Sequence, residues 1–137
     1  MLFRSEGDLQ SGRRVFQQLC APCHKLFGEG GNLAPDLTGS GRASIEYLLE
    51  NLIDPNAIVP ADYRMTTLTL KDGRVLNGLL REPTERTVAL WTATGRVTLE
   101  RREIAQQETT PQSMMPEGLL ESLPSTQVRD LLAYLSQ

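Results

Sequence analysis

Cys20-Ala21-Pro22-Cys23-His24 contains both cysteines and the single histidine of this 137-residue chain. The residues before it, Leu9 to Leu19, are predicted to form a helix that places Gly12, Phe16 and Leu19 on one face. A small residue on that face permits close contact with another helix. The chain thus gathers its thiols and its only imidazole at one helix end.

Three kinds of site use such residues. A thioredoxin-type dithiol follows a strand, and no apolar strand precedes Leu9. A structural zinc site needs four ligands, which this chain lacks unless carboxylates join. Cys-x-x-Cys-His is typical of covalent heme c attachment, in which each thiol forms a thioether with one vinyl group and the histidine binds iron. We therefore predict one heme c and its iron, bound by Cys20, Cys23 and His24.

The composition of the chain excludes several other classes of protein. Hydrophobic residues make up 39% and charged residues 23%, as in a soluble globular domain, and the net charge is -3. An acidic chain is unsuited to nucleic acid, and no apolar run approaches the ~20 residues of a membrane span. Residues 1–8 lack the features of a secretory signal, although heme c attachment requires export. We expect a mature or excised fragment of a periplasmic or otherwise extracytoplasmic protein.

Two further helices are predicted. Ser44 can cap a helix that ends before Pro55, and Ser125 or Thr126 can cap a final helix after Pro124. Their apolar stripes consist of Ile45, Leu48, Leu49 and Leu52 in the first and of Val128, Leu131, Leu132 and Leu135 in the second.

From about Asp62 to Glu108 the helical period stops and short β-prone runs appear. Gly78, in the middle of one run, would permit a sharp bend, and Trp91 is assigned to the core. Four or five strands in this length predict a strongly bent sheet or a small SH3-like or Sm-like barrel. The runs are 66–70, 75–81, 87–91 and 96–100, with turns at 71–74 and 94–95.

The helices, the pentapeptide and the loop Pro35-Asp36-Leu37-Thr38 resemble cytochrome c of the His/Met type. That resemblance implies that the Pro35 carbonyl accepts a hydrogen bond from His24 and fixes its ring. The family usually has glycine before this proline, where this chain has Ala34. Residues 28–39 are expected to form an irregular loop.

With its β insertion the chain resembles, more narrowly, a heme-binding domain family that is abundant in Planctomycetes and Verrucomicrobia. Members are often found at the end of larger proteins with dehydrogenase or propeller domains. The resemblance implies an electron-accepting role with a redox partner protein, a dehydrogenase or another cytochrome. The matching motifs are 20–24, 35–39, 47–51, 54–57, 71–74, 115–119 and 130–135.

The expected fold class is a mainly α cytochrome c fold, with three to four helices around heme and an inserted small β-sheet or barrel. Residues 1–60 and 109–137 would form the heme domain, and residues 61–108 the inserted β module.

The sixth iron ligand cannot be a second histidine of this chain. The loop 113–116 precedes the last helices, where His/Met cytochromes hold their axial methionine. The resemblance implies Met115, because the family methionine directly precedes the proline. Met114 is the alternative, followed by Met65 or an open site.

The first hypothesis is a monoheme electron-transfer protein, not an enzyme, although it can be a domain of a larger oxidoreductase. The second is a heme sensor or peroxidase-like enzyme with a labile or open sixth site. The third is a binding module in which the β segment contacts a partner. Arg42 either reaches a heme propionate or is a solvated surface residue, and exposed strand edges permit a dimer.

Overall fold

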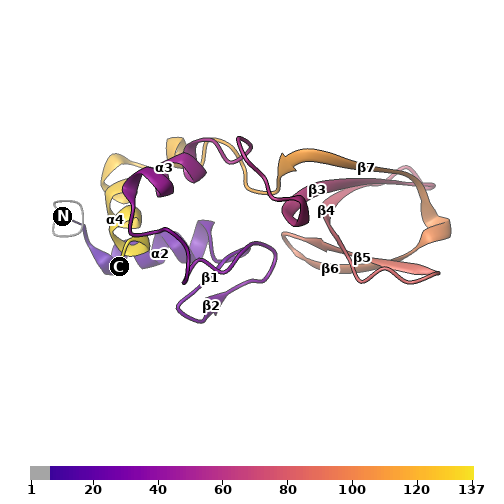
Figure 1. The fold of residues 1–137 in the computed structure, drawn as a ribbon, viewed down its shortest axis with the longest axis horizontal. Helices are drawn as coiled ribbons and strands as arrows, with labels where there is room; N and C mark the ends of the chain where they lie inside the picture. Colours follow the sequence, from indigo (N-terminus) through magenta and orange to yellow (C-terminus); the bar gives the residue numbers. More distant parts are fainter. Residues whose placement is uncertain (1–6) are drawn as a thin grey trace. The chain divides into compact units, whose positions relative to one another are not determined.

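The computed structural model describes residues 7–137, and its helices and strands are labelled in Figure 1. The chain divides into two compact units. The first combines the residues up to Pro55 with Pro116–Gln137, and the second is Asn56–Met115. The sequence had suggested a division at residues 60/61 and 108/109.

The described residues of unit 1 form the helices α2 (Leu9–Leu19), α3 (Ile45–Ile53) and α4 (Ser125–Leu135). Asp8 caps α2 by accepting hydrogen bonds from two backbone amides, and Ser44 caps α3 at Tyr47 N. A short hairpin, β1 (Lys25–Leu26) and β2 (Glu29–Gly30), follows the pentapeptide. A 3-10 turn, Leu120–Ser122, precedes α4.

Helices α2 and α4 pack directly against each other. A Cβ added at Gly12 would lie 2.0 Å from the backbone oxygen of Asp130, so only glycine permits this approach. The Asp130 carboxylate also accepts a hydrogen bond from Asp8 N, at 2.9 Å. Next to these contacts the rings of Phe16 and Tyr134 pack with centroids 5.6 Å apart. The start of α2 is therefore fixed on the middle of α4 by both steric fit and a charged acceptor.

Unit 2 is a five-stranded antiparallel sheet with the order β6-β5-β4-β3-β7 (Figure 1). Gly78 lies where β4 changes partner, pairing with β3 before this point and with β5 after it. A Cβ there would lie 2.5 Å from Trp91 O, so a larger residue would separate β4 from β5. The strands are β3 (Arg64–Leu70), β4 (Val75–Arg81), β5 (Thr87–Thr92), β6 (Gly95–Glu100) and β7 (Ile104–Ser113), with 3-10 turns at Ala61–Tyr63 and Arg101–Glu103.

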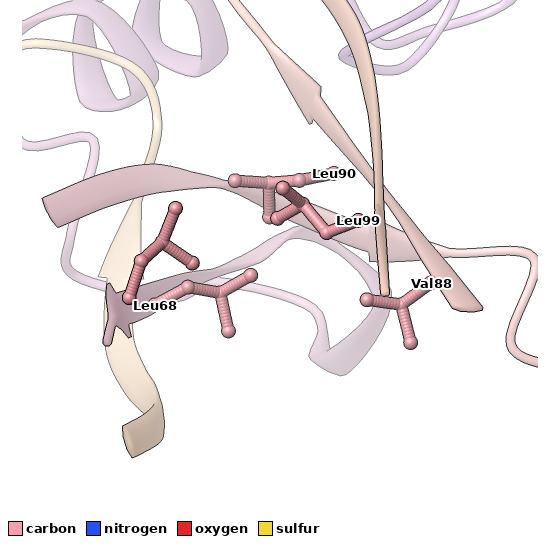
Figure 2. Packing of buried hydrophobic residues seen from close by; sticks show 5 residues of the cluster. Leu68, Val88, Leu90 and Leu99 are labelled. Atoms are coloured by element: carbon pink, nitrogen blue, oxygen red, sulfur yellow. The ribbon is translucent and has the colours of Figure 1, made fainter. Parts of the chain in front are cut away.

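The core of unit 2 lies inside the bend of this sheet. Leu68 of β3 and Leu90 of β5 come from strands that do not pair with each other, yet they belong to one buried cluster. Figure 2 shows Leu68, Val88, Leu90 and Leu99 of that cluster. In the described strands β6 and β7 are the two edges, so hydrogen bonding does not close the sheet into a barrel.

The prediction of a mainly α fold is wrong, because helix and strand contribute about equally. Two physical reasons account for the difference. Long parts of unit 1, such as residues 31–44, form loops and turns, so that helix makes up less of its described residues than expected. In addition, β7 extends to Ser113, although its side chains are mostly polar and exposed and gave no alternating apolar signal.

Smaller expectations also differ from the structure. Neither Ser125 nor Thr126 caps α4; Pro124 occupies the N-cap position and no side chain caps the helix. Trp91 is half-buried and does not belong to the fully buried core. Glu29 and Gly30, expected in an irregular loop, pair with β1.

Among residues 7–137, none of the helices is both long enough and apolar enough to cross a membrane.

Replacing Gly12 by alanine tests the contact between α2 and α4. We expect Gly12→Ala to lower the free energy of unfolding by about 1–3 kcal/mol, because the methyl group must displace the α4 backbone. Urea denaturation measures this loss. Gln18→Ala, on the exposed face of the same helix, is the control. Equal stability of the two variants would contradict the close approach.

Asp130 gives a prediction about pH. Asp8 N, which donates to the carboxylate, lowers the pKa of Asp130 below its ordinary value of about 3.9. The stabilisation is therefore complete from about pH 5 upward, about one unit above the unfolded pKa, and is lost as the pH falls through the lowered pKa of the folded state. Asp130→Asn should be less stable than wild type at neutral pH, and the difference should shrink in acid. Urea denaturation across this range checks the trend, which a constant difference would refute.

Candidate heme attachment site

The pentapeptide follows α2 as a tight turn. Cys20 is the C-cap of α2, and its N–H donates to Phe16 O at 2.8 Å. The N–H of His24 then donates to Cys20 O, also at 2.8 Å. Because Phe16 is fully buried, the turn begins from a fixed point in the core of unit 1. The helix thus brings both cysteines and the histidine together.

The two cysteines are free thiols. Burial, and to a smaller extent the neighbouring Cys23, raises the pKa of Cys20 to about 12. Burial also raises the pKa of Cys23 above its ordinary value. Both thiols are therefore protonated at neutral pH, unlike the low-pKa cysteine of a dithiol oxidoreductase. This environment argues against the dithiol alternative.

His24 is held by a single strong contact. Its Nδ1 lies 2.7 Å from Pro35 O, and because a carbonyl only accepts, Nδ1 carries the proton. The Nε2 lone pair is then the free position on the ring. Burial lowers the pKa of His24, and the hydrogen bond to Pro35 opposes this shift by a smaller amount. Neutral imidazole with a free Nε2 is the form that binds a metal.

The loop after the hairpin lies directly on the backbone of the pentapeptide. Gly31 N donates to Ala21 O at 2.8 Å, and Ala34 N donates to Cys23 O at 2.9 Å. Gly30 has a φ of 123°, and a Cβ there would lie 1.9 Å from His24 O. Gly30 is a site residue for which the sequence carries no motif, apart from the run of glycines in which it lies.

These residues fit heme c. Cys20 and Cys23 would hold it by thioethers, His24 would bind its iron, and Pro35 would orient the histidine. Within residues 7–137, no cluster of three or more His, Cys, Asp or Glu side chains is arranged around a metal position.

Met114 and Met115 belong to unit 2, whereas His24 belongs to unit 1. Met115 N donates to Ser113 Oγ at 3.0 Å, and Ser113 N donates to Asn56 Oδ1 at 2.8 Å. The backbone before Pro116 is thus fixed within unit 2. The choice of Met115 as sixth ligand stays a prediction, and Met65, in β3, is the other methionine of this unit.

Arg42 is half-buried and contacts protein groups, so the interpretation as a solvated surface residue is wrong. Its guanidinium lies over the ring of Phe27, 4.7 Å from the centroid. It also donates to the backbone oxygens of Thr38 and Leu135, each at 3.2 Å.

Comparison with known proteins gives a match to one family model. A family model described as cytochrome C oxidase, cbb3-type, subunit III matches residues 7–72. This range includes α2, the pentapeptide, Pro35 and α3, and it ends before Met115. A search of curated proteins finds no match. The family match supports a c-type cytochrome domain, and hence heme and heme-based electron transfer in general, but it does not support the narrower planctomycete and verrucomicrobial family.

Proposed function

We propose that this chain is a monoheme c-type cytochrome domain that transfers single electrons outside the cytoplasm. The observation that carries the proposal is the pairing of His24 Nδ1 with Pro35 O beside two free cysteines. This pairing prepares one imidazole nitrogen for a metal, and the thiols stand at the spacing that heme c attachment uses. Its electron donor or acceptor would be a dehydrogenase or another cytochrome.

Each residue has a distinct role in this proposal. Cys20 and Cys23 attach the porphyrin, so that the group stays in place without depending on iron ligation alone. His24 donates Nε2 to the iron, and Pro35 keeps the imidazole in the required tautomer and orientation. The bound heme supplies an iron that changes by one electron between its ferric and ferrous forms.

Met115 is proposed as the sixth ligand. It directly precedes Pro116, and the hydrogen bond from its N–H to Ser113 Oγ fixes the backbone at this position. A thioether ligand stabilises ferrous iron and raises the reduction potential. With His24 and Met115 both bound to the iron, no position would remain there for a substrate. This arrangement favours electron transfer over sensing or peroxide chemistry.

Mass and spectrum together test the attachment. The full chain, matured in a host that assembles cytochromes c, should carry one heme by intact mass and give a heme c pyridine hemochrome spectrum. Cys23→Ala should retain heme through Cys20 alone and move the hemochrome band to longer wavelength, because one vinyl group stays conjugated. A colourless wild-type chain at the bare polypeptide mass would overturn the proposal.

The sixth ligand is tested by a pair of methionine variants. We expect Met115→Ala to lose the far-red charge-transfer band of the ferric protein and to keep its covalent heme. Met114→Ala is the matched control and should keep the band. The reverse pattern would assign Met114. Rapid binding of carbon monoxide to the reduced wild-type protein would instead favour the sensor or peroxidase-like alternative.

A further inference from the structure

Arg42 joins three parts of unit 1 that are distant in the sequence. Its Nε donates to Thr38 O at 3.2 Å, in the loop that carries Pro35. One terminal nitrogen donates to Leu135 O at 3.2 Å and to the backbone oxygen of Gln137, at the end of α4. The guanidinium plane covers Phe27, in the turn of the small hairpin.

Thr38 and its neighbour Leu37 are also bonded to the hairpin that follows His24. Its Oγ1 accepts a hydrogen bond from Phe27 N at 3.0 Å, and the neighbouring Leu37 N donates to Lys25 O at 2.8 Å. The loop is thus attached to the hairpin just after Pro35, whose carbonyl holds His24. Pro35 itself is exposed, and its carbonyl is positioned by backbone hydrogen bonds on either side of it, from Ala34 N to Cys23 O and from Leu37 N to Lys25 O.

Arginine suits this position better than lysine. A planar guanidinium can cover an aromatic ring and donate to several carbonyls at once, whereas an ammonium is a compact point charge. A positive charge is also favourable at the C-terminus of α4, where backbone carbonyls have no partner within the helix. Phe27 packs edge-on against Tyr134 of α4, with ring centroids 6.1 Å apart, so the hairpin is in direct contact with the helix.

We propose that Arg42 is a positioning residue that sets the strength of the hydrogen bond between His24 and Pro35, and through it the reduction potential of the heme. This inference rests on the proposed function. A stronger hydrogen bond from Nδ1–H increases the basicity of the histidine, which donates more to iron and favours the ferric form. A looser loop weakens the bond and favours the ferrous form.

Loss of the charge of Arg42 and loosening of the loop with Pro35 would shift the reduction potential in opposite directions, so the test must separate the two effects. Removing a positive charge favours ferric iron, whereas loosening the loop favours ferrous iron. Arg42→Lys keeps the charge and loses the planar contacts. Arg14→Lys is the matched control, because Arg14 is exposed on α2.

The experiment uses the full chain with heme attached. We expect Arg42→Lys to raise the midpoint potential in a spectroelectrochemical titration, so that the ratio of ferrous to ferric protein at a fixed applied potential increases severalfold. The Nδ1–H of His24 should exchange faster with solvent by NMR. Arg14→Lys should change neither quantity. If Arg42 only stabilised the fold, Arg42→Lys would lower the free energy of unfolding and leave the midpoint potential unchanged.

A second variant covers the case in which Arg42→Lys does not fold. Phe27→Leu removes the aromatic ring under the guanidinium but keeps the backbone hydrogen bond from residue 27 to Thr38. We expect a smaller upward shift of the potential in the same direction. If the folded variants keep the wild-type potential and exchange rate, the inference fails while the heme proposal stands. If the wild-type chain carries no heme, the proposed function itself fails.

Discussion

The close approach of α2 to α4 determines where the candidate heme attachment site lies. Gly12 leaves room for the backbone of Asp130, and Asp8 N is bound by the carboxylate of the same residue. One turn further along α2, Phe16 is buried against Tyr134, and the amide of Cys20 closes on the carbonyl of Phe16. The position of the cysteines therefore follows from a contact between helices that is made by other residues than the cysteines and the histidine. The loop with Pro35 is then placed by backbone amides that donate to the pentapeptide and to the hairpin.

Much of the local structure was predictable from the sequence. The bounds of α2 and β4 follow directly from apolar periodicity and turn residues, and Ser44 caps α3 as expected. The strand β7 was not predictable in full, because most of its residues are polar and its pairing with β3 is a long-range choice. The balance of helix and strand was misjudged for the same reason. An apolar sequence pattern indicates an element with a buried face. Loops and an exposed edge strand have no such face, so they leave no pattern in the sequence.

The candidate site could also be predicted only in part. Cys20, Cys23 and His24 lie within five residues of the sequence, so a role in heme attachment could be predicted for them without a structure, and Pro35 entered only through a family resemblance. The contacts of Arg42 could not be inferred. Its partner Leu135 lies 93 residues away, and nothing in the local sequence indicates that a helix end meets the loop there. The need for glycine at position 30 could not be predicted either, because the atom that leaves no room for a side chain there is the carbonyl oxygen of His24.

The separation of α2 from α4 along the chain has a consequence for the order of folding. Asp8 and Asp130 are 122 residues apart, and all of unit 2 lies between them. In contrast, β3 to β6 pair as successive hairpins, whose short loops cost little entropy to close. We expect the sheet to form first and to bring the two ends of the chain closer together. Until α4 has packed against it, α2 lacks the partner that Gly12 and Phe16 contact in the folded chain, and the turn with the cysteines begins from a helix that is not yet held in place.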